Sequence, residues 1–194
     1  MSLPTTDFAP ANPTDGRQPL EWQSKYTDPR VRRWILIETI YLISLLFAMP
    51  TMMLVLWLEY PQHWLELSDQ KYRTLFLYGL AWIGGTLGGT LFDIKWLYHS
   101  VARQIWHMDR RLWRFFTPHI SGGLAFIVLT LISSGLLRVF DQHAIESPSL
   151  VLGMTFLVGY FSDSTVAKLA EIADTIFGTT RSTKKQDEQP DAPK

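Results

Sequence analysis

Long apolar segments alternate with short charged segments along most of the chain. The apolar segments cover residues 34–57, 74–98, 118–140 and 148–161. A transmembrane helix needs about 20 mostly apolar residues, because it must cross a hydrocarbon core about 30 Å thick. Since the first three segments meet this length, the pattern predicts an integral membrane protein of the all-α class. Together with the fourth segment they predict a four-helix bundle.

Three of the four predicted helices begin with a recognisable start signal. Asp28, Thr117 and Ser147 are each followed directly by proline. A side-chain oxygen at the N-cap accepts a hydrogen bond from the first turn, and proline at the first helical position sacrifices no helical bond. These residues therefore predict the starts of the first, third and fourth helices. Pro50 lies inside the first segment, where it predicts a kink.

The fourth segment differs from the others because it is too short to cross a membrane alone. Residues 148–161 would form a helix only about 21 Å long. Residues 163–177 follow it with apolar side chains at helical spacing, and Gly178 is typical of a helix end. One interpretation is a continuous or slightly bent rod, which we favour. The other is a new amphipathic helix capped by Ser162 or Asp163 that lies on the membrane or on a neighbouring subunit.

The segments divide the chain into three parts. Residues 1–28 form a polar, proline-rich arm, residues 29–178 form the transmembrane domain, and residues 179–194 form a tail. Lysine and arginine concentrate before the first span, between the second and third, and after the fourth. Because such residues favour the cytoplasmic side, we expect both termini in the cytoplasm and a bacterial inner membrane as the location.

Small residues in the second and third spans predict close helix packing. They are Gly84, Gly85, Gly88, Gly89, Gly122 and Gly123. Glycine lets two helix backbones approach closely, which matters in lipid because hydrophobicity does not drive helices together there. The second span is therefore expected to be the packing centre, with the third span against it.

Ionisable residues gather near the predicted cytoplasmic ends of the spans. This polar ring consists of Glu38, Asp93, Lys95, His119 and Asp163. Ionisable groups at membrane depth are costly and usually face a bundle interior or a wet cavity, so the ring is a candidate ion path. The alternative is structural: Glu38 pairs with Lys95, and Asp93 with Arg33, as ties at the helix ends.

The sequence gives little support for a metal site, a haem, a nucleic-acid partner or a catalytic site. Glu38, Asp93 and Asp163 offer oxygen ligands for a hard cation, but no loop motif fixes their spacing, so the identity of any metal stays open. The histidines near the spans lie at or outside one boundary, which argues against haem held across the bundle, and we expect no cofactor. A formal net charge of zero argues against nucleic acid as a partner. No nucleotide-binding or catalytic motif is present, so an enzyme is not expected.

Two functions fit these features. Glycine-rich helix faces, a polar ring at one depth and an amphipathic C-terminal helix favour a small homo-oligomeric ion channel or membrane-permeabilising protein. The alternative is a non-catalytic accessory or scaffold subunit of a larger membrane complex. The expected partners are the lipid bilayer and either copies of the chain or other membrane subunits. A symmetric ring of copies would indicate the channel, and a single copy among unlike chains would indicate the subunit.

Overall fold

The computed structural model describes residues 26–137 and 147–178. The helices in these ranges are α1 (Pro29–Trp57), α2 (Tyr60–Trp64), α3 (Asp69–Ala102), the short 3-10 helix η1 (Met108–Arg110), α4 (Arg111–Ser133), α5 (Pro148–Tyr160) and α6 (Ser162–Phe177). The described part of the chain contains no strand, which confirms the all-α class. The tail and nearly all of the N-terminal arm lie outside the described residues, as does the end of the predicted third span, 138–140.

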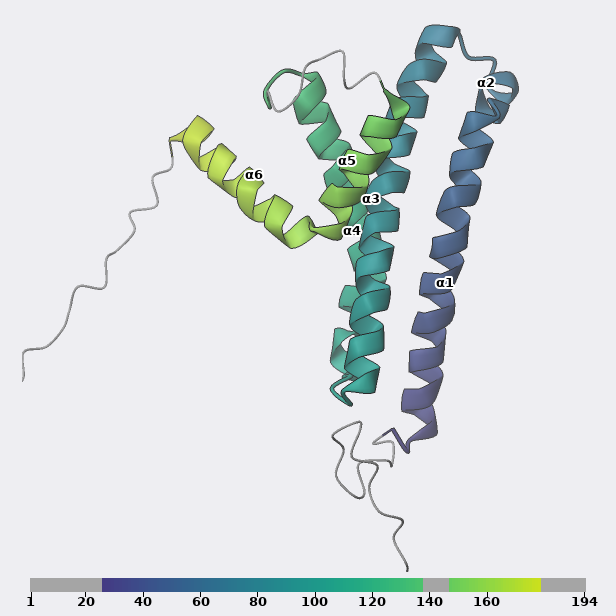
Figure 1. Ribbon diagram of the computed structural model, residues 1–194, viewed down its shortest axis with the longest axis vertical. Coiled ribbons are helices and arrows are strands. Elements are labelled where there is room, and N and C mark those ends of the chain that lie inside the picture. Colours follow the sequence, from purple (N-terminus) through teal and green to yellow (C-terminus); the bar gives the residue numbers. More distant parts are fainter. Residues whose placement is uncertain (1–25, 138–146, 179–194) are drawn as a thin grey trace, which may run out of the picture.

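Helix α3 is the centre of the molecule. It contacts α1 on one side and α4 and α5 on the other, and α5 also packs on α4. Figure 1 shows α1 standing beside α3 over most of its length, with α5 and α6 on the opposite side. The helices α1 and α3 and the stretch Met108–Ser133 are long and apolar enough to cross a membrane. The pair α5 and α6 adds a fourth span only if the two helices are counted as one.

The first helix begins where the sequence predicts. The carboxylate of Asp28 accepts a hydrogen bond from the backbone N–H of Arg30 at 2.8 Å, and Pro29 occupies the first helical position. These are the contacts that satisfy free N–H groups at a helix start. Pro50 lies inside α1, as expected.

The predicted start of the third span at Thr117 is wrong. Helix α4 begins at Arg111, so Pro118 lies inside it. Thr117 does not cap a helix, because its hydroxyl donates to the backbone oxygen of Trp113 at 2.8 Å. An internal proline removes one helical hydrogen bond. The extra turns before it place the Arg114 side chain in the protein interior, and this tertiary contact outweighs the local loss.

The predicted rod of the fourth span is also wrong. Helix α5 ends at Tyr160, and α6 departs from it at an angle of 95°. The corner is Phe161, whose φ of −106° and ψ of 37° lie outside the helical region. Helix α5 follows the glycine groove of α3, which ends where Phe92 contacts the ring of Tyr160. A straight continuation would have no small-residue groove to enter, so the chain turns away.

The glycines of α3 hold α4 and α5 at close range. A Cβ atom at Gly84 would lie 2.9 Å from the backbone oxygen of Leu152 in α5. A Cβ atom at Gly85 would lie 2.5 Å from the Cβ of Ala125 in α4. Gly88 faces α5 and Gly89 faces α4 in the same way. Neighbouring glycines of α3 therefore pack against two different helices, α4 and α5.

On the partner helices, the contacts are uneven. Gly122 of α4 faces the Thr86 side chain closely, whereas a Cβ at Gly123 would make only an ordinary contact of 3.7 Å with Trp82. Gly159 of α5 packs directly on the backbone of Gly85. The glycine faces are thus filled by helices of the same chain.

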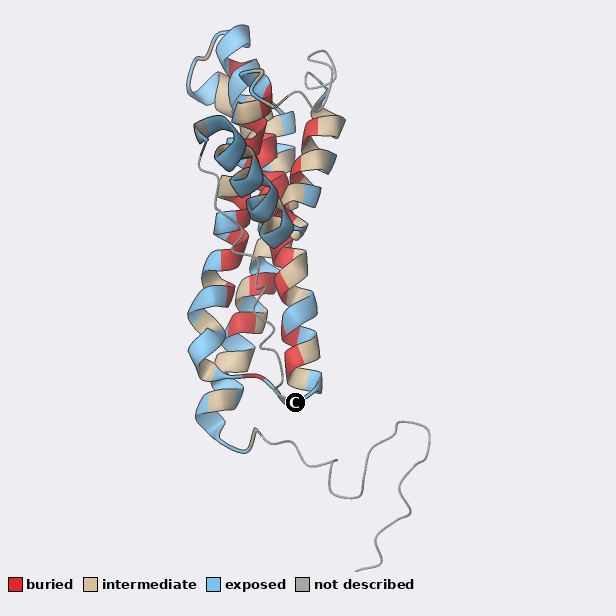
Figure 2. Ribbon diagram, turned by 90° about the vertical axis from the view of Figure 1, so that its left-hand side faces the viewer, coloured by how far each residue is buried: buried red, intermediate tan, exposed pale blue. Residues whose placement is uncertain are grey.

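Two apolar clusters fix the helices at different heights. The first lies where α3, α4 and α5 meet, and it consists of Leu80, Ala81, Val128, Leu129, Ile132 and Val151. The second contains Leu42, Leu97 and Trp106, where α1 meets α3 and the connection that follows it. Figure 2 shows the buried residues along the facing sides of the bundle helices, whereas the described side chains of α6 are exposed or half-buried and none is buried. The second cluster adjoins the buried charges described next.

Candidate functional site

A buried ion pair joins α1 to α4. The Nε of Arg114 lies 3.0 Å from Oε2 of Glu38, and its Nη2 lies 3.5 Å from Oε1. The indole N–H of Trp106 donates to the same Oε2 at 2.9 Å. Glu38 is 1% exposed, and Arg114 and Trp106 are each 5% exposed. Both oxygens of the Glu38 carboxylate are therefore bound inside the protein.

The pair also fixes the connection between α3 and α4. Arg114 donates through Nη2 to the backbone oxygen of His107 at 3.3 Å, and its guanidinium lies 5.5 Å from the Trp106 ring centre. The backbone N–H of Trp106 donates to the hydroxyl of Tyr26 at 2.9 Å. Glu38 thus ties together the residues before α1, the connection, and the first turn of α4. Such a network is costly to break, since one lost partner leaves a buried charge unpaired.

Asp93 is the second buried carboxylate of this region. It is fully buried on α3, and neither of its oxygens has a hydrogen-bond partner among the described residues. It interacts electrostatically with both Arg114 and Glu38. The cluster therefore holds two carboxylates for one guanidinium, so its charge balance has room for a proton or a cation.

A line of small polar side chains leads from Asp93 toward the middle of the bundle. Thr90 and Thr86 lie one and two turns away on α3, and Ser121 faces them from α4. The Thr90 hydroxyl donates to the backbone oxygen of Thr86 at 2.7 Å. The hydroxyls of Thr86 and Ser121 are buried and have no hydrogen-bond partner in the described part of the chain. Buried groups of this kind are uncommon and mark the α3–α4 seam as the polar interior of the bundle.

The structure does not gather the whole predicted polar ring. Glu38 and Asp93 share the buried cluster, but Lys95, His119 and Asp163 are exposed. Asp163 lies in the first turn of α6, beyond the corner that takes this helix away from α5. The three carboxylates do not converge, and the described residues include no group of three acidic or histidine side chains placed to hold a metal.

The predicted partners of the two carboxylates also differ from those observed. Glu38 pairs with Arg114 rather than Lys95, whose Nζ instead lies 3.5 Å from the Tyr160 hydroxyl. Lys95 is two residues from Asp93, which places it about 200° around the same helix, on the opposite face. Arg33 is exposed and makes no hydrogen bond with Asp93.

Sequence reasoning missed the roles of Arg114 and Trp106. By sequence, Arg114 falls in the basic connection between the second and third spans, because the predicted third helix begins after it. The missed signal is its spacing: Arg114 precedes Ser121 and Ala125 by seven and eleven residues, so all three share the inward face of α4. Trp106 carries no such signal, since it lies outside the regular helices.

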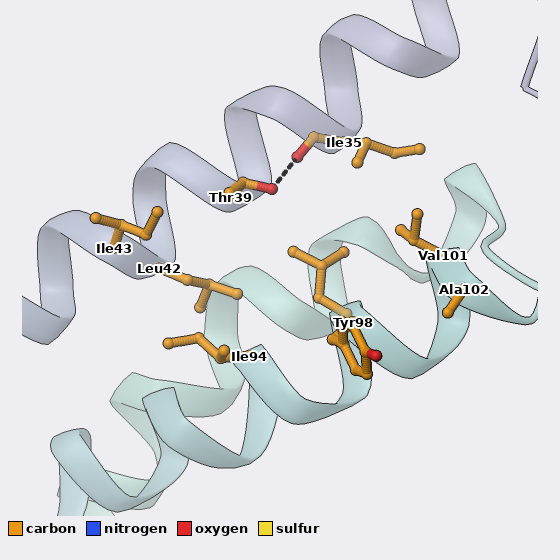
Figure 3. Close-up of a pocket in the computed structure, with 9 residues that line it drawn as sticks. Ile35, Thr39, Leu42, Ile43, Ile94, Tyr98, Val101 and Ala102 are labelled. Atoms are coloured by element: carbon orange, nitrogen blue, oxygen red, sulfur yellow. Dashed lines mark hydrogen bonds between the residues drawn. The ribbon is translucent and has the colours of Figure 1, made fainter.

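An apolar groove lies beside the buried pair, between α1 and α3 (Figure 3). It measures about 370 Å³ and is lined by Ile35, Thr39, Leu42, Ile43, Ile94, Leu97, Tyr98, Val101 and Ala102. The Thr39 hydroxyl donates to the backbone oxygen of Ile35 at 2.8 Å, so it offers no free donor to a ligand. The chemistry of this groove suits hydrocarbon rather than a polar molecule.

No protein-family model matches the chain, and no curated protein or solved structure resembles it significantly. Function must therefore be inferred from the geometry of the chain itself. That geometry combines a closely packed helix bundle, a buried charge cluster and a helix that turns away from the bundle.

Proposed function

We propose that this chain is a non-catalytic assembly subunit of a membrane complex, in which the bundle is the anchor and α6 is the docking helix. One observation carries the proposal. The 95° turn takes α6 away from α5 beside Gly88, the twentieth of the 34 residues of α3, and leaves most side chains of α6 exposed. A stripe toward the bundle, which includes Thr165, Leu169 and Ile172, is half-buried.

The two faces of α6 require different surroundings. Val166 and Ile176 are about half exposed, at 52% and 50%, while Lys168 and Glu171 form an exposed ion pair of 2.8 Å. Among the described side chains of α6, only Leu169 packs against the main apolar cluster of the bundle. Charged groups at this height of a spanning bundle are costly in lipid, and apolar groups are costly in water. Another protein chain supplies both kinds of contact.

The glycine faces give no support to packing between copies of the chain. Gly84, Gly85, Gly88 and Gly89 contact α4 and α5 of the same chain, so they are not free to pack against a second copy. Self-assembly would therefore have to use another surface. The exposed faces of α6 are the better candidates for assembly.

Substitutions on α6 test this proposal. Val166→Asp and Ile176→Asp should release the partner, because each places a charge in the apolar face, whereas Ser164→Asp on the opposite, exposed face should not. The measurement is the native mass of the full chain extracted from its own membranes in mild detergent. A wild-type chain that runs alone, or release by Ser164→Asp as well, would contradict the proposal.

A second candidate is a homo-oligomeric ion channel. It is favoured by Asp93 and by the polar line formed with Thr86 and Ser121, since unpaired buried polar groups in a membrane protein often mark an ion path. The same mass measurement separates the two functions. A ring of identical copies that conducts ions in planar bilayers would favour the channel over the assembly subunit.

We further propose a bacterial inner membrane with both termini in the cytoplasm, which requires that α5 and α6 together make the fourth crossing. Arg30, Arg33, Arg103 and Arg110 lie at the end of the bundle where α1 begins and α3 ends, which is the arrangement expected for the cytoplasmic side. Topology reporters fused after Lys194 and within 141–146 should then report opposite sides of the membrane. Equal readouts would mean that α5 and α6 enter and leave on one side, as a re-entrant pair.

A further inference from the structure

Because α5 stops beside Gly88, the lower part of the same side of α3 has no helix to cover it. A groove of about 350 Å³ opens there, beneath the corner between α5 and α6. Its lining consists of Phe92, Lys95, Trp96, His99, Arg103, Tyr160 and Phe161. The groove is a consequence of the incomplete fourth span.

The groove is basic at one end and aromatic at the other. Lys95 and His99 lie one turn apart on one face of α3, and Arg103, the residue directly after the helix, follows four residues later. The aromatic side chains of Phe92 and Tyr160 lie toward the middle of the bundle, with ring centres 6.0 Å apart. The described residues that line the groove include no carboxylate, and neither Lys95 nor Arg103 forms an ion pair with a described acidic residue.

The depth of this groove follows from the charge pattern of α3. Residues 74–92 carry no charge and extend about 28 Å as a helix, which matches the thickness of a hydrocarbon core. Lys95 therefore lies at the boundary of the hydrocarbon, and Arg103 lies about 12 Å further out, among the lipid headgroups. Trp96 fits the same position, because tryptophan favours this interface.

We propose that this groove binds an anionic phospholipid, with the phosphate at Lys95, His99 and Arg103 and the acyl chains along Phe92 and Phe161. A lipid of the adjoining leaflet has the same polarity as the groove: charged at the boundary and apolar toward the middle. Basic pockets beside transmembrane helices bind anionic headgroups in this way. The proposal rests only on the chain crossing a membrane and does not depend on the function of α6.

Lipid binding by the purified full chain tests the site. Native mass spectrometry would count phosphatidylglycerol, phosphatidylcholine or inorganic phosphate retained on the wild type and on Lys95→Gln/Arg103→Gln. We expect one tightly retained phosphatidylglycerol and about 30-fold weaker binding by the double variant, since each basic residue contributes about a factor of 5.5 to anionic binding. The control is Arg33→Gln/Lys71→Gln, which removes the same charge from exposed residues outside the groove.

The remaining outcomes also decide the proposal. Equal retention of phosphatidylcholine and phosphatidylglycerol would overturn it, and so would equal loss in the control. Retention of inorganic phosphate at the same affinity as the lipid would show a free anion site instead. If the double variant fails to fold, the comparison of the three probes on the wild type still tests the preference for an anionic lipid.

Discussion

Arg114→Met should lower the free energy of unfolding by about 3–5 kcal/mol, because it leaves the buried Glu38 carboxylate without its counter-charge. Asp93 makes the loss more severe, since it adds a second buried carboxylate to the same cluster. Glu38→Gln should cost less than Arg114→Met, because Asp93 remains as a counter-charge for the guanidinium. The larger loss for Arg114→Met than for Glu38→Gln follows from the two carboxylates that share one guanidinium.

A double-mutant cycle separates the buried pair from a general packing defect. Glu38→Gln combined with Arg114→Met should recover part of the single losses, with a coupling energy of about 2–3 kcal/mol. Lys95→Met is the matched control, since Lys95 is an exposed cation of α3 that does not contact Glu38. It should change stability by less than about 0.5 kcal/mol and give no coupling with Glu38→Gln.

Reversible denaturation of the purified chain in detergent micelles, followed by circular dichroism, measures these free energies. Rescue of Glu38→Gln by Lys95→Met would restore the pairing first predicted from sequence. Strict additivity of Glu38→Gln and Arg114→Met would show that the two side chains do not interact.

The contrast between Lys95 and Arg114 shows what the sequence can and cannot predict. Hydropathy gives the depth of a residue in the membrane, because the bilayer requires each span to be a continuous, internally bonded helix. Depth alone made Lys95 a plausible partner for Glu38. The face of the helix decides otherwise, and choosing the face requires knowing which helices are neighbours.

The helix ends show the same limit. The cap at Asp28 acts locally, and its prediction is confirmed because nothing beyond the first turn is needed to form it. At Thr117 the same local signal fails, since the ion pair of Arg114 requires a longer helix. The corner at Phe161 depends on where the α3 groove closes, and no property of residues 148–177 alone reveals this.

Each face of α3 contacts a different neighbour. Gly84 and Gly88 face α5, Gly85 and Gly89 face α4, and Leu97 packs with Leu42 of α1. Lys95 lies on the side that α5 leaves open. Helix α3 therefore packs against α1, α4 and α5 with separate faces, and a further face lines the groove. A larger side chain at one of its glycines should disturb the packing of one neighbouring helix only.

Gly159→Ala should destabilise the protein by about 3 kcal/mol, whereas Gly153→Ala in the same helix should be nearly neutral. A Cβ atom at Gly159 would lie 2.8 Å from the Cα of Gly85 and would also contact the Gly85 backbone oxygen. Both obstacles are backbone atoms, so they cannot move aside as a flexible side chain would. A Cβ atom at Gly153 would meet nothing within 4 Å.

The two alanine variants share a residue type, a helix and a membrane environment, so their difference isolates the packing against α3. Gly88→Leu should behave like Gly159→Ala or worse, because a Cβ at Gly88 would lie 2.7 Å from the backbone nitrogen of Tyr160. Thermal unfolding in detergent provides the ranking, with Gly153→Ala as the reference. Equal stability of Gly153→Ala and Gly159→Ala would mean that α5 does not lie in the glycine groove of α3, and the turn at Phe161 would then lose its physical cause.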